Sequence, residues 1–152
     1  MDELFELLRA LRLPAKDYAI FGSGPLIVRG VIPASNDLDV LCRGSAWEAV
    51  CALAPPRVVA PWGVELVSLY EDRLTFGTTW AIGDVDVDDL IETAERHLGL
   101  PFVRLEHVIA YKKLSGRPKD LAHLDALARH GGGGKGPAAL VSTAGPDPST
   151  SA

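Results

Sequence analysis

The sequence predicts a single α/β domain, with a short mixed β-sheet flanked by helices and a C-terminal pair of helices closing a cleft. Three observations support this. Segments with helical spacing of apolar residues alternate with short apolar runs typical of strands. Turn-forming Gly and Pro residues separate these segments. At 152 residues, 47% of them hydrophobic, the chain is long enough for one substantial core.

The first third of the chain predicts two helices and two strands. Leucines at helical spacing predict an amphipathic helix over residues 2–12, which stops at Pro14. The apolar run over residues 18–21 predicts a strand, and residues 25–29 follow as a short helix. After a loop, residues 37–42 form the second predicted strand.

The middle of the chain predicts one helix and two strands. Ser45 is a candidate N-cap, with Glu48 three residues later, so residues 46–53 are expected to form a helix. Two further strands are expected over residues 57–60 and 64–70.

The remaining part is less regular. Residues 71–83 predict no element. Asp86 is expected to cap a helix that runs to Leu98 and ends at Gly99. The last predicted elements are an extended piece and two helices, over residues 102–104, 105–114 and 119–129.

The C-terminal residues differ in composition from the rest. We expect the folded domain to cover residues 1–130 and residues 131–152 to be a disordered tail, because that segment is rich in Gly, Pro, Ser and Thr.

Charge and cysteine content limit the classes of function. The formal net charge is −5, so general coating of nucleic acid is not expected. Cys42 and Cys51 lack metal-ligand spacing. Met1 begins an acidic segment without a basic leader, and no apolar run reaches the roughly 18 residues of a membrane span. We therefore expect a cytoplasmic protein with no membrane contact; the sequence leaves its oligomeric state open.

The turn Gly22-Ser23-Gly24 and the pair Asp37-Leu38-Asp39 predict a nucleotide and metal site. Gly22 and Gly24 permit a tight turn after the first strand, and Ser23 can meet a phosphate oxygen at the following helix start. Side chains two apart in a strand share a face, so Asp37 and Asp39 can hold a cation together. A nucleoside triphosphate (NTP) with Mg²⁺, or with Mn²⁺ in its place, fits this pattern.

Such a site usually needs a third carboxylate. Glu65 is the candidate, because it interrupts an apolar run where an acid would be costly to bury without a cation. The alternative is that Glu65 points to solvent from a half-exposed strand. Asp86 and Asp88 also alternate and are a rival candidate for a metal site, although a helix N-terminus explains them better.

A basic segment near the C-terminus supplies the second half of the predicted site. Lys112 lies one helical turn from Val108 and Ile109, so the first atoms of its side chain are close to the buried face of the helix. Arg117, Lys119 and Asp120 follow at a helix start, where a triphosphate can bind. A solvated charged face is the alternative explanation of this segment.

Together these segments resemble the polymerase-beta nucleotidyltransferase superfamily, and within it small bacterial proteins related to the type IV abortive-infection toxins of toxin–antitoxin systems. The resemblance spans most of residues 18–127. It implies a minimal nucleotidyltransferase fold and transfer of a nucleotide to RNA, tRNA, a protein or a small-molecule hydroxyl. It assigns phosphate binding to Gly22 and Ser23 and metal binding to Asp37 and Asp39.

The resemblance further assigns the triphosphate to Lys112, with Lys119 and Asp120 completing the site. Two departures are visible. His123 stands where relatives often have an acid, and no Arg precedes Asp37 closely. The rival interpretation is therefore a non-catalytic nucleotide-binding or antitoxin-like module of the same fold.

Overall fold

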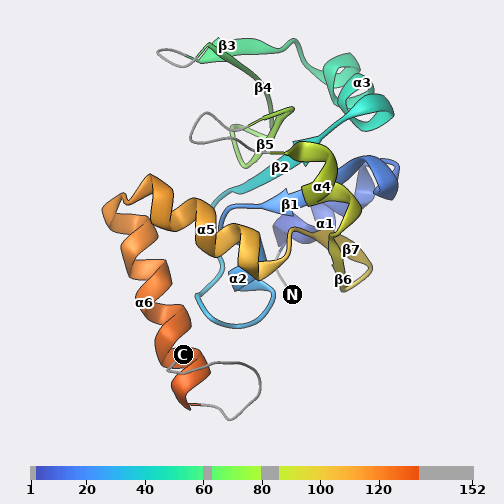
Figure 1. The fold of residues 1–152 in the computed structure, drawn as a ribbon. Helices are drawn as coiled ribbons and strands as arrows, with labels where there is room; N and C mark the ends of the chain where they lie inside the picture. Colours follow the sequence, from blue (N-terminus) through green and yellow to red (C-terminus); the bar gives the residue numbers. More distant parts are fainter. Residues whose placement is uncertain (1–2, 60–62, 80–85, 134–152) are drawn as a thin grey trace.

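The computed structural model describes residues 3–59, 63–79 and 86–133. Within them a seven-stranded mixed sheet has the order β3-β4-β5-β2-β1-β7-β6 (Figure 1). The strands are β1 (Tyr18–Phe21), β2 (Leu38–Cys42), β3 (Arg57–Val59), β4 (Val64–Leu69), β5 (Leu74–Gly77), β6 (Glu95–His97) and β7 (Leu100–Phe102). The helices are α1 (Glu3–Ala10), the 3₁₀ helix η1 (Ala15–Asp17), α2 (Gly24–Ile27), α3 (Gly44–Leu53), α4 (Val87–Glu92), α5 (Leu105–Ser115) and α6 (Pro118–Gly133).

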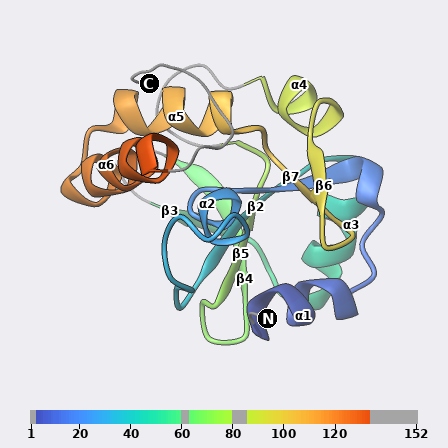
Figure 2. The same ribbon diagram turned by 90° about the horizontal axis from the view of Figure 1, so that it is seen from below.

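Helices cover both faces of the sheet, because the central strands β1 and β2 are apolar on both sides. Ile20 and Val40 pack in one buried cluster with apolar residues of α1 and α3. Phe21 and Leu41 point the other way and pack with residues of α4 and α5. Figure 2 shows α4 and α5 on one side of the sheet and α1 on the other.

The strand that bears the acidic pair lies at the centre of the sheet. β2 pairs antiparallel with β1, so that Asp39 stands opposite Phe21. On its other side β2 pairs parallel with β5, and Asp39 stands opposite Thr75. The sheet is thus larger than the short one predicted, and its centre is β5-β2-β1.

The sequence patterns did not predict two parts of the sheet, β5 and the β6–β7 hairpin. β5 lies within residues 71–83, where no element was predicted. The helix predicted to reach Leu98 is wrong, because α4 ends at Glu92 and the β6–β7 hairpin follows. Leu98 and Gly99 form the hairpin turn with φ angles of 56° and 77°, so Gly99 serves a strand connection and not a helix end.

The start of α3 also differs from the prediction. Arg43 is its N-cap residue and makes no side-chain capping bond. Ser45 lies inside the helix, and its hydroxyl donates to Asp17 Oδ2 at 2.7 Å. Ser45 therefore ties α3 to η1 and does not cap the helix.

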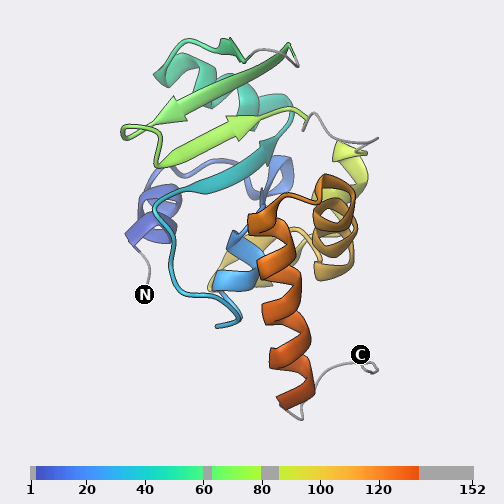
Figure 3. The same ribbon diagram turned by 90° about the vertical axis from the view of Figure 1, so that its left-hand side faces the viewer.

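The C-terminal helix pair is confirmed, and α5 and α6 are in contact. Figure 3 shows the C-terminal half of α6 extending away from the sheet. The helix continues to Gly133, three residues past the predicted domain end at 130; the rest of the predicted tail lies outside the described residues. No helix in the described ranges is long and apolar enough to cross a membrane.

Candidate functional site

A small pocket lies where β1, β2, α5 and α6 meet. Its cavity volume is about 30 Å³, which is space for two or three water-sized groups by roughly 10–15 Å³ each. It is lined by Phe21, Gly22, Ser23, Asp39, Val108, Tyr111, Lys112, Arg117, Lys119 and Asp120. Residues from two predicted halves, separated by about seventy positions in the chain, thus line one pocket.

Gly22 and Ser23 form the first wall of the pocket. Gly22 has a φ of +63°, and a Cβ atom there would lie 2.8 Å from Asp39 Oδ2. Only glycine therefore lets the turn approach this carboxylate so closely. Ser23 is buried at the start of α2, and its side chain makes no capping hydrogen bond.

Gly24 has a different role from the one predicted. It does not line the pocket. A Cβ atom at Gly24 would lie 2.3 Å from Ile20 Cγ2. Gly24 therefore allows α2 to pack closely against β1, which positions the turn without contributing to its surface.

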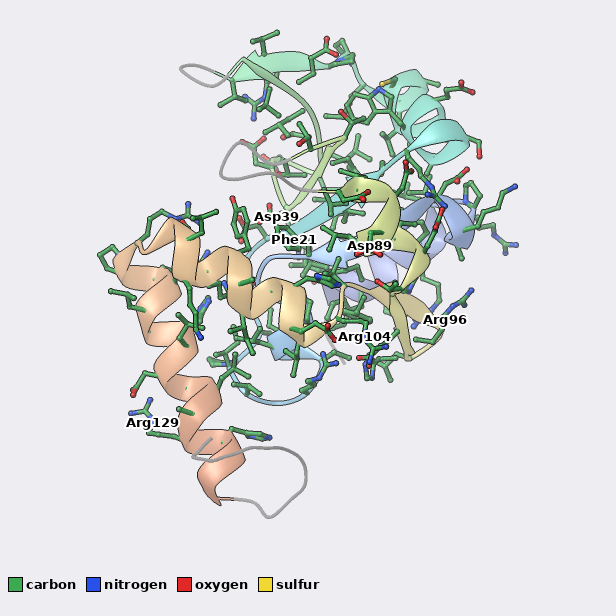
Figure 4. All side chains as sticks on the ribbon, viewed as in Figure 1. Phe21, Asp39, Asp89, Arg96, Arg104 and Arg129 are labelled. Carbon is green, nitrogen blue, oxygen red and sulfur yellow. The ribbon has the colours of Figure 1, made fainter. Side chains whose placement is uncertain are left out.

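Asp39 is one of two acids that line the pocket, and its side chain is half-buried. Figure 4 shows it beside Phe21, next to α5. Burial, together with the charge of Asp37, raises the pKa of Asp39 to about 6, against the opposing effect of Lys119, Lys112 and Arg117. Within the described residues no hydrogen bond or ion pair engages its carboxylate.

Asp37 lies just before β2 and is exposed. It does not line the pocket, yet its charge acts on Asp39. Asp39 therefore lines the pocket, whereas Asp37 is exposed outside the lining and acts on Asp39 through its charge.

The structure does not bring Glu65 to this pair, which corrects its prediction as third ligand. Glu65 is exposed in β4 and shares a face with Val67, whose cluster packs against α1 and α3. That is the face opposite to Asp39. The residues level with Asp39 on the next two strands are Thr75 and Ser68, neither of which is acidic.

The rival acidic pair, Asp86 and Asp88, lies at the N-terminus of α4, as the sequence predicted. Asp86 Oδ1 accepts from the backbone N–H of Asp89 at 3.1 Å and so caps α4. Asp88 pairs with Arg43 at 2.7 Å. Among the described residues no group of three or more His, Cys, Asp or Glu side chains could hold a metal ion.

Lys112 is nearly fully buried and lies in a compact polar cluster. Its Nζ atom is 3.0 Å from His123 Nδ1 and 3.4 Å from Asp120 Oδ1. Arg117 Nε donates to Asp120 Oδ2 at 2.9 Å. The neighbouring Lys113 is exposed, so the two adjacent lysines differ as the helical geometry predicted.

The charge states of this cluster follow from its packing. Burial lowers the pKa of Lys112, and the charge of Asp120 opposes that effect. Burial alone would raise the pKa of Asp120, but the hydrogen bond from Arg117 and the charge of Lys112 lower it to about 2. Burial and the charges of Lys112 and Lys119 lower the pKa of His123. Asp120 is therefore ionised at neutral pH, and the lowered pKa of His123 favours its neutral ring.

Sequence reasoning missed Phe21, Val108 and Tyr111 as pocket residues, and His123 as a contact of Lys112. The rings of Phe21 and Tyr111 pack edge to face with centroids 4.9 Å apart. The helical spacing of the sequence indicates two of these residues, Tyr111 and His123. Tyr111 follows Val108 by three residues, and His123 follows Asp120 by three.

The donor set is consistent with a magnesium ion bound together with phosphates. Mg²⁺ usually binds proteins through one or two carboxylates and completes its shell with waters and phosphate oxygens. Asp39 and Asp37 supply two carboxylates, and the missing side chain of Gly22 leaves Asp39 Oδ2 accessible. The chain matches no protein-family model, no curated protein and no solved structure.

Proposed function

We propose that this protein binds an NTP with Mg²⁺ and transfers its nucleotidyl group to a hydroxyl of RNA, tRNA, a protein or a small molecule. One observation carries the proposal. An unpaired, half-buried carboxylate at Asp39 and a buried ammonium at Lys112 line the same small pocket beside the Gly22–Ser23 turn. Burying charges of both signs is costly, and a ligand that brings a cation and phosphates together relieves both costs.

Each pocket residue has a role in this proposal. Asp39 and Asp37 would hold Mg²⁺, which neutralises phosphate charge when it is bound. Ser23 can donate its hydroxyl to a phosphate oxygen, and Lys112 can donate from Nζ. Arg117 and Lys119 are exposed at the mouth of the pocket and can neutralise the outer phosphates.

The proposed reaction is an in-line displacement. The acceptor hydroxyl attacks the α-phosphorus, a new P–O bond forms, the bond to the bridging oxygen breaks, and pyrophosphate leaves with the electron pair. The cationic side chains stabilise the charge that develops on pyrophosphate. The proton of the hydroxyl passes to solvent or to a carboxylate at the site.

A second candidate is supported by a specific observation. Thr75 and Ser68 stand level with Asp39 in the sheet, where a third carboxylate would be needed to activate the acceptor. The lack of an acid there favours a module that binds Mg²⁺ and NTP without turnover, such as a nucleotide sensor or an antitoxin-like partner.

One experiment separates the two candidates. Purified protein is incubated with each of the four α-³²P-labelled NTPs, Mg²⁺ and total RNA, and labelled RNA and labelled protein are resolved on gels. Label transfer that requires Asp39 supports the transferase. Calorimetric binding without transfer supports the binding module. Absence of both binding and transfer with every NTP contradicts both candidates.

A further inference from the structure

His123 is the closest polar contact of the buried Lys112. The 3.0 Å separation of Lys112 Nζ and His123 Nδ1 is a hydrogen-bond distance. An ammonium can only donate, so Nδ1 must be the acceptor and the proton of the neutral ring must be on Nε2. His123 is therefore present as one defined tautomer.

The charges around Lys112 leave the pocket cationic. Three positive side chains, Lys112, Arg117 and Lys119, line the pocket together with two acids, Asp39 and Asp120. Asp120 contacts both Lys112 and Arg117. A neutral acceptor at position 123 satisfies one donor of the ammonium and leaves this excess of one positive charge. A carboxylate there would cancel it.

We propose that His123 is a positioning residue that holds Lys112 through a neutral acceptor and so preserves the positive charge that attracts the phosphates of the nucleotide. This inference rests on the proposed function, since it concerns the same pocket. His123 does not line the pocket and acts through Lys112.

The groups that face His123 are few. On α5 its charged neighbour is Lys112, and on α6 they are Lys119 and Asp120. Only α5 packs extensively against α6 among the described elements. Burial of the ring, together with one buried lysine, one exposed lysine and one aspartate, thus determines the tautomer and charge of His123.

The tautomer is tested first, without nucleotide. In ¹⁵N NMR spectra of the imidazole at pH 7.5, His123 should show a protonated Nε2 and an unprotonated, hydrogen-bonded Nδ1. In Lys112→Met the Nδ1 signal should shift toward that of a free acceptor nitrogen. A proton on Nδ1, or spectra that do not respond to Lys112→Met, would overturn the proposal regardless of any binding result.

Matched variants test the role in binding. In Asn and Asp, Oδ1 occupies the position in the side chain that corresponds to Nδ1 of His, so His123→Asn keeps a neutral acceptor while His123→Asp adds one negative charge. Ala122→Asp adds the same charge at an exposed neighbouring position of α6. Binding of Mg²⁺–ATP and of magnesium tripolyphosphate is measured by calorimetry.

We expect His123→Asn and Ala122→Asp to bind within about threefold of the parent, and His123→Asp to bind at least tenfold more weakly, or about 1.4 kcal/mol. His123→Asp should melt no lower than His123→Asn, because its carboxylate pairs with the ammonium. Equal weakening by Asn and Asp, or by both Asp variants, would refute the proposal. If the parent binds neither ligand, the proposed function itself fails.

Discussion

Replacing Asp39 by asparagine should stabilise the folded protein at neutral pH while abolishing its response to Mg²⁺–NTP. Burial and the charge of Asp37 raise the pKa of Asp39 from 3.8 to about 6. The folded state therefore binds more protons than the unfolded state between these two values, and stability falls as pH rises through that window. Above pH 6 the folded protein holds an ionised carboxylate at a cost that asparagine does not have.

The size of the effect follows from the shift. A difference of about two pKa units corresponds to an upper limit of about 3 kcal/mol, and partial access of the carboxylate to solvent reduces it. We expect Asp39→Asn to gain about 1–3 kcal/mol of unfolding free energy at pH 7.5, and the gain to vanish as pH falls below 4. Urea unfolding of both proteins at several pH values between 3.5 and 8 measures this directly.

The control is Glu65→Gln, which removes an exposed carboxylate from the opposite face of the sheet and should change unfolding free energy by less than about 0.5 kcal/mol. Mg²⁺ with ATP should raise the melting temperature of the parent and of Glu65→Gln, but not of Asp39→Asn. A pH-independent difference between Asp39→Asn and the parent, or a destabilised Asp39→Asn at pH 7.5, would refute the reasoning about this buried charge.

Three further predictions concern the pocket. Lys112→Met should weaken Mg²⁺–ATP binding in calorimetry by roughly ten- to a hundredfold through loss of a charge-assisted contact, while Lys113→Met stays near the parent; equal losses would indicate diffuse electrostatics. Gly22→Ala should lower unfolding free energy by about 1–3 kcal/mol more than Gly30→Ala, since both have positive φ but only Gly22 lacks room for a Cβ atom; equal costs in urea unfolding would contradict this. Asp120→Asn should lose about 2 kcal/mol at pH 7, because the pKa of Asp120 is lowered to about 2; the loss should shrink as pH falls from 4 to 2, and a loss constant with pH would count against it.

Local pattern was sufficient for the elements that carry the first half of the site. The predicted strand over residues 18–21 matches β1, and the predicted strand over residues 37–42 differs from β2 by one residue. The alternation in β2 placed Asp39 opposite to Val40, as the buried clusters confirm. These strands are short, apolar and bounded by turns, so their pattern is unambiguous.

The missed strands lack such patterns. β5 is the four-residue segment Leu74–Gly77 in polar surroundings, and its strand character comes from pairing with β2 and β4 on both sides. The β6–β7 hairpin was hidden because Ile91, Ala94 and Leu98 match helical spacing. Gly99 suggested a helix end, whereas the paired positive φ angles of Leu98 and Gly99 make a two-residue turn.

The position of Glu65 could not be predicted from its own strand. Whether Glu65 shares a face with Asp39 depends on the register of β4 on β5 and of β5 on β2, and a shift of one residue would reverse the answer. The contact of His123 with Lys112 depends likewise on how α6 packs on α5. Contacts that depend on the register of neighbouring strands or on the packing of two helices are determined by the tertiary fold. The spacing of residues along one element does not predict them.

Asp39 and Lys112 line one pocket with opposite charges, yet they form no ion pair. The reason lies in the second helix of the C-terminal pair. Asp120 and His123 hold the ammonium of Lys112 from α6, so that it cannot turn toward Asp39 without leaving buried acceptors unsatisfied. Asp39 remains available to a cation, and Lys112 keeps a donor available to an anion. A ligand that carries both, as a metal-bound polyphosphate does, completes the pocket where a simple anion or a bare cation would satisfy only one side.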